Sequence, residues 1–291
     1  MPTDNLKNEN SYMDLKVLIE FSDVVMDYII ESVNRKKRIA EIWDISIIFL
    51  YMDIVESAKS IMCLYESNNY FGIKSLTRLM LERYMYLIQT EKYEKSAKAY
   101  FYKMRIEDHD YLKKIISIES RTGSSANLLG LNIENISEKF PHLADPLYID
   151  KIETEYMKCF DWNPKEPPRK WFNYNNEVNS IEKLCVKETN DIPYSLHYSL
   201  FSTEIHGTQP NKKFDKIPGI NLIRISNEFN NDRTLLPFSS LYFFNATSLI
   251  LRHYSAPKKM FADLSSRIRS NRNFANLVTS ELSDRNKSKK K

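Results

Sequence analysis

The sequence predicts an all-α protein, and two observations support this fold class. Apolar side chains follow the period of an amphipathic helix along most of the 291 residues, and strand-like alternation is confined to one short region. Only 5 glycines occur, too few for a β-rich fold with many tight turns. Hydrophobic residues make up 42% of the chain, which is typical of a folded globular protein. We therefore expect a single helical-bundle domain.

Four long helices are expected in the first half, over residues 12–33, 40–67, 70–89 and 91–119. The Asn-rich segment ESNNY ends the second helix, and Thr90 is expected to cap the start of the fourth. The third helix is apolar nearly all round. Such a helix is buried on most sides, so we expect it to be central in the fold.

The second half of the chain is less regular. A loop opens at SRTGSSAN, and the Pro-rich segment WNPKEPPRKW precedes expected helices over residues 176–188 and 193–206. The alternating runs INLIRIS and RTLLP predict a small β-hairpin near residues 220–236. The apolar segment PFSSLYFFNATSLILRHY then predicts another helix, and a polar helix follows it.

The charge of the chain is unevenly distributed. The net charge is +4, yet the segment from Pro257 to Lys291 holds ten Lys and Arg against three Asp and Glu. We therefore divide the chain into a helical domain, residues 1–255, and a basic tail, helical or disordered, over residues 256–291. Such a tail either contacts nucleic-acid phosphates or only increases solubility.

Several classes of protein are excluded or disfavoured by missing patterns. Neither G-x-G-x-x-G nor G-x-x-x-x-G-K-[ST] occurs, so the common nucleotide-binding loops are absent. Cys63, Cys159 and Cys185 show no C-x-x-C spacing and are expected to be reduced thiols packed as small hydrophobic groups. The longest apolar stretch is interrupted by Asp44 and Asp53, which favours a buried helix over a membrane span. We expect a cytoplasmic protein with no membrane partner, no metal and no cofactor.

A stripe of charged residues follows the third expected helix. Lys74, Arg78 and Glu82 are spaced four residues apart among Leu, Met, Ile and Tyr, so they share one face of that helix. A charge on a mostly buried helix is costly unless it is paired. Two interpretations remain open: the Arg78–Glu82 pair only locks the helix to its neighbours, or the stripe lines a polar cleft with Arg78 facing an anion.

A second polar stripe lies in the segment SLHYSLFSTEIHG. On a helix Ser195, Ser199, Ser202 and His206 share one face, and small hydroxyl groups allow another helix to approach closely. If this face packs on the stripe of the third helix, His206 and Arg78 line one pocket. The alternative is that His206 only stabilises the carboxyl end of its helix, with Gly207 as the left-handed cap.

These residues resemble the pattern of a bacterial domain family of unknown function. The pattern, which spans roughly residues 40–250, consists of Arg78-x-x-x-Glu82, Trp171, Tyr194, Tyr198 and Ser202-x-x-x-His206-Gly207. That layout is in turn similar to the HEPN superfamily of all-α ribonucleases and nucleotide-binding domains. The resemblance implies an HEPN-like core, a homodimer, and a role in bacterial defence or toxin systems with a partner protein.

The resemblance also implies roles for individual residues. His206 would serve as general acid or base on RNA, since histidine titrates near neutral pH. Arg78 would hold the scissile phosphate and Glu82 would orient Arg78. Lys74, Tyr198 and Ser202 would hold the substrate, which we expect to be single-stranded or tRNA-like RNA.

One departure from the superfamily keeps other interpretations open. Metal-independent HEPN ribonucleases share an R-x4-6-H motif, but Ser199, Leu200 and Phe201 occupy its three arginine positions before His206. The nearby pair Arg105 and His109 is too closely spaced to supply the motif. Either Arg78 supplies the positive charge from another helix, or the domain is a non-catalytic module that binds a protein, a nucleotide or RNA. A hydrolase built on Ser202 and His206 lacks an orienting acid.

Overall fold

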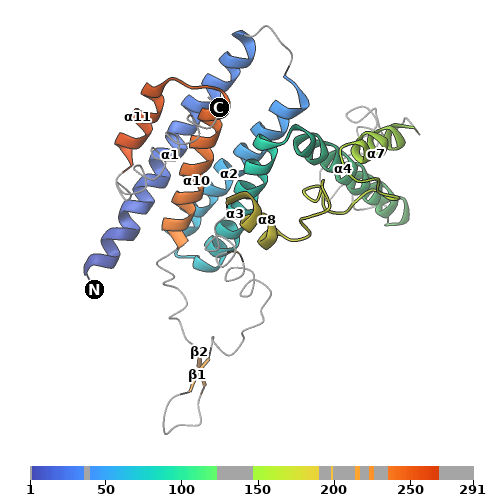
Figure 1. The fold of residues 1–291 in the computed structure, drawn as a ribbon. Coiled ribbons are helices and arrows are strands. Elements are labelled where there is room, and N and C mark those ends of the chain that lie inside the picture. Colours follow the sequence, from blue (N-terminus) through green and yellow to red (C-terminus); the bar gives the residue numbers. More distant parts are fainter. Residues whose placement is uncertain are drawn as a thin grey trace. The chain divides into compact units, whose positions relative to one another are not determined.

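The described part of the chain is mainly helical, which confirms the predicted all-α class (Figure 1). This computed structural model describes residues 2–35, 40–122, 147–189, 198, 214–216, 223–225 and 235–268. It contains eight helices within those ranges: α1 (Pro2–Arg35), α2 (Ile42–Glu66), α3 (Tyr70–Lys92), α4 (Glu94–Thr122), α7 (Tyr148–Lys158), α8 (Ile181–Thr189), α10 (Leu235–His253) and α11 (Lys258–Arg267). None of these helices combines the length and apolar composition needed to cross a bilayer.

The chain divides into two compact units. Unit 1 comprises Met1–Ala40, Ile48–Ile88 and Ile181–Lys291, and unit 2 comprises Glu41–Ile47 and Gln89–Ser180. The division falls inside α2 and α3, so each of these helices contributes to both units. The predicted boundary between a domain 1–255 and a tail 256–291 stays a prediction, although α11 is helical, as expected for the start of that tail.

Helix α10 lies at the centre of unit 1. It packs along α1, as Figure 1 shows, and hydrogen bonds join it to α2 and α3. The hydroxyl of Tyr51 on α2 lies 3.1 Å from that of Thr247, which donates to the carbonyl of Phe243. The hydroxyl of Thr77 on α3 lies 2.8 Å from that of Ser239. These paired hydroxyl groups give buried polar atoms partners across the helix interfaces, as burial requires.

Helix α3 is largely buried, as predicted. Every described side chain between Gly72 and Glu91 is buried or half-buried, and none is exposed. The ring of Tyr84 stacks on that of Tyr242 in α10, with centroids 6.4 Å apart. The predicted helix end at ESNNY is also confirmed: Asn68 adopts a φ of 58°, and the Asn69 side chain accepts a hydrogen bond from the Gly72 amide at the start of α3.

Unit 2 has an aromatic core. Helix α4 packs against α7, and the Trp171 ring meets Tyr100 of α4 nearly edge-on, with centroids 5.0 Å apart. The non-helical segment between α7 and α8 is held by hydrogen bonds to its carbonyl oxygens, from Gln89 to Phe172 and from Tyr156 to Pro168. These bonds satisfy backbone groups that have no helical partner.

Two predictions about helix boundaries were wrong. Thr90 does not cap α4, because α3 continues to Lys92 and α4 begins at Glu94; the carbonyl of Thr90 accepts a hydrogen bond from Trp43 instead. The helix expected from residue 176 begins at Ile181. A turn precedes it, in which Asn176 has a φ of 60°, a backbone conformation incompatible with a helix.

The predicted hairpin and cysteine positions need correction in part. Strand β1 (Phe214–Lys216) pairs antiparallel with β2 (Ile223–Ile225), so the described part of the run INLIRIS is a strand, but its partner precedes it. The last three residues of the run RTLLP instead begin α10. Pro237 lies in the first turn of that helix, where the backbone N–H that proline lacks has no partner within the helix. Cys159 and Cys185 are buried as expected, whereas Cys63 is exposed on α2.

Candidate functional site

The charged stripe of α3 is present and its central pair is formed. Arg78 Nε lies 3.1 Å from Glu82 Oε1, and the two side chains are only 17% and 20% exposed. Lys74, one turn earlier, is buried with 9% exposure. The predicted pairing of Arg78 with Glu82 is therefore confirmed, and it lies in unit 1.

Tyr198 completes this cluster from a distant part of the sequence. Arg78 Nη2 donates a hydrogen bond of 3.0 Å to the Tyr198 hydroxyl, and Arg78 Cζ lies 5.0 Å from the centre of the tyrosine ring. Glu82 and Tyr198 thus contact the same guanidinium group, which has further N–H donors beyond these two contacts. Among the predicted site residues, the structure brings Arg78, Glu82 and Tyr198 together.

The environment keeps Tyr198 in its neutral form at physiological pH. Burial raises the pKa of its hydroxyl, and the carboxylate of Glu82 raises it further, while the hydrogen bond from Arg78 opposes the shift. A protonated phenol can accept from Arg78 and donate to another oxygen. The cluster therefore presents both cationic and neutral donors within one half-buried region.

The remaining predicted site residues lie outside the described residues. They are Ser202 and His206, together with Ser195, Ser199, Tyr194 and Gly207 of the same segment. The close approach of this serine stripe to α3, and the convergence of His206 with Arg78, stay predictions. Tyr198 is the described residue of that segment, and it is helical.

Trp171 and the pair Arg105–His109 belong to unit 2 rather than to this cluster. Trp171 is buried in the aromatic core, so its contacts are those of a packing residue. Arg105 is exposed with its guanidinium over the Phe101 ring, whereas His109 is buried near Tyr148 of α7. The two side chains therefore differ in environment although they lie one turn apart on α4.

A second arginine of α3 was missed by the sequence analysis. Arg83 Nε lies 3.1 Å from Asp53 Oδ2 on α2, and Arg83 Cζ lies 5.9 Å from the ring centre of Tyr86. Burial raises the pKa of the Asp53 carboxyl, and Arg83 opposes that shift only in part. In the sequence Asp53 only interrupts an apolar stretch, and nothing in the local spacing indicates a partner on the next helix.

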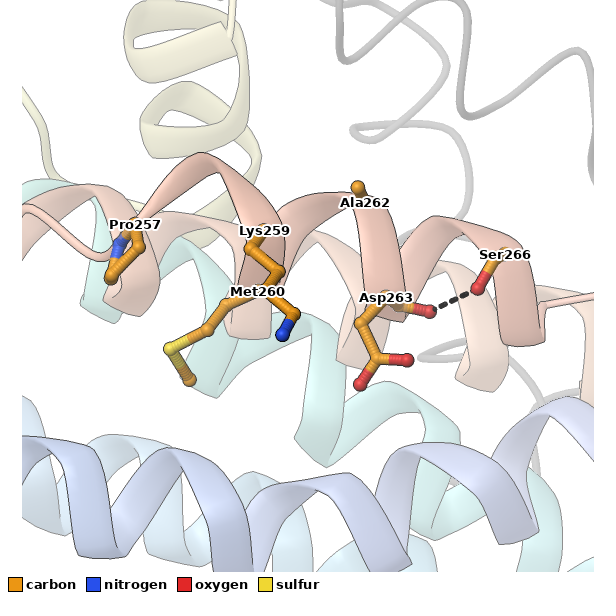
Figure 2. A pocket seen from close by; sticks show the side chains of 6 residues that line it. All are labelled: Pro257, Lys259, Met260, Ala262, Asp263 and Ser266. Atoms are coloured by element: carbon orange, nitrogen blue, oxygen red, sulfur yellow. Dashed lines mark hydrogen bonds between the residues drawn. The ribbon is translucent and has the colours of Figure 1, made fainter.

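Two further questions concern the described residues: whether they could hold a metal ion, and whether a depression lies at the predicted site. No group of three or more His, Cys, Asp or Glu side chains arranged to hold a metal ion occurs in the described ranges. An open depression beside α11 is lined from that helix and its N-cap by Pro257, Lys259, Met260, Ala262, Asp263 and Ser266 (Figure 2). None of the predicted site residues lies there.

The helical fold and the Arg78 cluster define an all-α domain with a buried charged site. Residues 44–213 match the family described as "Family of unknown function (DUF5677)", and the chain belongs to this family. The match ends earlier than the expected span to residue 250, yet it includes every residue of the pattern from Arg78 to Gly207. Helices α1, α10 and α11 lie outside it. No curated protein and no solved structure matches the chain.

Proposed function

We propose that this protein is an HEPN-like effector of a bacterial defence or toxin system that binds and cleaves RNA at Arg78. The contact set around Arg78 is the observation that carries this proposal. A half-buried guanidinium is fixed by Glu82 on its own helix and by Tyr198 from a remote segment, and it keeps N–H donors for a further partner. Fixed arginine donors match the geometry of phosphate oxygens.

The burial of the charged stripe suits an anionic ligand. Arg78 is held by Glu82, and Lys74, a second cation one turn earlier on the stripe, is also buried. Because the side chains are largely removed from water, each interaction with a bound anion is stronger than on an open surface. Glu82 would orient Arg78, and the neutral Tyr198 would donate to a phosphate oxygen.

The proposed chemistry assigns the proton transfers to His206. A base takes the proton of a ribose 2′-hydroxyl, the 2′-oxygen forms a bond to phosphorus, and the bond from phosphorus to the 5′-oxygen breaks. The leaving 5′-oxygen takes up a proton, so the products are a cyclic 2′,3′-phosphate and a free 5′-hydroxyl. His206 serves at one of these two proton transfers, and Arg78 stabilises the charge on the phosphate oxygens. The proposal includes a homodimer, which the HEPN resemblance implies.

The direct test is cleavage of labelled single-stranded RNA by the purified protein. We expect His206→Ala to lose cleavage by at least about 100-fold, the usual contribution of a general acid or base, while its melting temperature stays nearly unchanged. His253→Ala, a histidine at the end of α10, is the matched control and should retain activity. Expression of the wild-type protein or of His253→Ala should arrest growth, whereas expression of His206→Ala should not.

The same assay distinguishes cleavage from binding alone. Arg78→Ala should lose both RNA binding and cleavage. If the wild-type protein binds RNA through Arg78 but His206→Ala changes nothing, the site is a non-catalytic RNA-binding module. If the wild-type protein neither binds nor cleaves RNA, the proposed function is wrong.

A further inference from the structure

One face of α3 carries more than the Arg78 cluster. Helical geometry places Ser75, Arg78, Leu79, Glu82, Arg83 and Tyr86 on the same side of the helix, and all six are half-buried. We call these residues the α3 strip. On the opposite side Ile73, Thr77 and Met80 are fully buried, whereas Tyr84 and Ile88 are half-buried. The strip is thus a partly accessible side of α3, and it carries both arginines of that helix.

The strip holds two arginines in closely similar surroundings. Each has a carboxylate oxygen 3.1 Å from Nε, Glu82 for Arg78 and Asp53 for Arg83. Each also has a tyrosine ring beside its guanidinium, Tyr198 at 5.0 Å and Tyr86 at 5.9 Å. The two arginines are five residues apart, which corresponds to about 7.5 Å along the helix axis and about 140° around it. They therefore lie near the two edges of the strip, and an extended strand that crosses the strip can contact both.

The contact between Arg83 and Asp53 is weaker than that between Arg78 and Glu82. Arg83 Nε is a buried donor without a hydrogen-bond acceptor in the described part of the chain, although a carboxylate oxygen lies within ion-pair distance. The side chain of Asp53 is 48% exposed, so solvent screens the attraction. Arg83 can therefore exchange Asp53 for another anion at little cost.

Helix α2 carries an exposed apolar side chain, Phe49, within about one helical turn of the level of Arg83. A Cβ atom at Gly72 would lie 2.7 Å from Leu64 Cδ1, and Asp53 pairs with Arg83, so both contacts fit one antiparallel register of α2 and α3. In that register Phe49, one turn before Asp53, lies at the level of Tyr86 and the residue after it. Phe49 is 42% exposed. The register therefore places an exposed phenylalanine at the same level as a half-buried tyrosine and about one turn from an arginine.

We propose that Arg83, Tyr86 and Phe49 form a second nucleotide subsite, which binds an unpaired nucleotide of the RNA strand whose phosphate is held at Arg78. This inference rests on the proposed function. Arginine contacts the phosphate, and the aromatic rings stack on a base, a combination that suits single-stranded nucleic acid because every unpaired base has an exposed face. Paired bases in a duplex are already stacked on their neighbours and cannot stack on the aromatic side chains. The subsite therefore selects single-stranded RNA.

The test uses two substitutions with opposite expected effects. Affinity for a labelled unstructured RNA of about 12 nucleotides is measured by fluorescence anisotropy over a salt series. Arg83→Gln should weaken binding and lower the slope of log Kd against log salt by about 0.7, the value for one phosphate contact on a single strand. Asp53→Asn removes the competing carboxylate and should tighten binding by about two- to fivefold. A purely structural ion pair would make both substitutions weaken binding or leave it unchanged.

Further variants test the base contact and provide the control. Tyr86→Leu keeps an apolar side chain but loses the stacking surface, so it should weaken binding of single-stranded RNA by roughly fivefold or more. Arg105→Gln removes an arginine that also lies over an aromatic ring, Phe101, but belongs to α4 in unit 2. It should leave affinity close to that of the wild-type protein.

The outcomes separate this inference from the proposed function. If Arg78→Gln abolishes binding while Arg83→Gln matches Arg105→Gln, the second subsite is wrong and the function stands. A preference for duplex RNA, or Asp53→Asn and Arg83→Gln changing affinity in the same direction, also overturns the subsite. If the wild-type protein binds no RNA, both proposals fail together.

Discussion

At the scale of single residues, Arg78 is a half-buried charge of unit 1 that is held by two partners. It holds a carboxylate and a phenol at once, and its side chain is largely buried. Removing either charged partner leaves the other in a poorly solvated position, and this cost is the physical reason that such pairs are sensitive to substitution. The Arg78–Glu82 pair therefore contributes to the stability of the fold as well as to the binding of any ligand.

A double-mutant cycle measures this coupling. Glu82→Ala and Arg78→Ala should each lower the free energy of unfolding by roughly 1–2 kcal/mol, less than for a fully buried pair because both side chains keep some solvent contact. The double substitution should cost less than the sum of the two, since no charge is then left unpaired. Urea denaturation gives the three values, and strict additivity would contradict the coupling.

The three cysteines differ in reactivity for a reason visible at each residue. Burial raises the pKa of the Cys159 thiol to about 11, so almost no thiolate forms at neutral pH, and Cys185 is also buried. Cys63 is exposed on α2. A maleimide should therefore label the native protein at Cys63 alone, and all three sites in denaturant. Cys63→Ser should abolish native labelling, and rapid labelling of that variant would contradict this assignment.

At the scale of elements, the helices of unit 1 are joined by buried hydroxyl pairs as well as by apolar packing. Tyr51 donates to Thr247, and Thr247 donates to the carbonyl of Phe243, so α2 and α10 share one directed chain of hydrogen bonds. Burial raises the pKa of Tyr51, which keeps its hydroxyl protonated as this chain requires. The pair thus adds directional contacts between two helices that otherwise meet through apolar groups.

The two ends of this chain should respond differently to substitution. Tyr51→Phe removes the terminal donor and leaves Thr247 bonded to its carbonyl, so we expect a loss of about 1 kcal/mol. Thr247→Val leaves the buried Tyr51 hydroxyl without its acceptor and should cost more, about 1–3 kcal/mol. Thermal and urea unfolding check the order. Tyr51→Phe combined with Thr247→Val should recover part of the loss; equal costs for the two single substitutions would disprove the directed chain.

At the scale of the whole molecule, the family match and the compact units do not coincide. The match over residues 44–213 contains α3 and Tyr198 but excludes α1 and α10, which complete the core of unit 1. Tyr51 and Thr77 depend on α10 for their hydroxyl partners. The charged cluster is therefore supported by helices that the family match does not include.

The basic C-terminal segment is a separate test at this scale. Residues 283–291 hold five Lys and Arg and one Asp, so their deletion removes a net charge of +4. If this segment contacts RNA, its loss should weaken binding and flatten the salt dependence, because fewer counterions are released. Replacement by a Gly/Ser segment of equal length controls for chain length. An unchanged slope would show that the segment contributes no phosphate contacts.

The sequence by itself determined the features that depend on local geometry. The helical period gave the all-α class, the Asn-rich turn ended α2, and the four-residue spacing paired Arg78 with Glu82 on one helix face. Such contacts follow from backbone dihedral angles alone, since residues i and i+4 always adjoin on a helix. Errors at Thr90 and residue 176 concern helix ends, where local preferences are weakest.

Only the tertiary structure decided which distant residues meet. Tyr198 lies against Arg78 across 120 positions of sequence, and Arg83 finds Asp53 on the preceding helix. It also assigned Trp171 to the core of unit 2 rather than to the charged cluster. Contacts of this kind depend on how whole helix faces pack, and that packing is set by the combined burial of many side chains rather than by the spacing of any two.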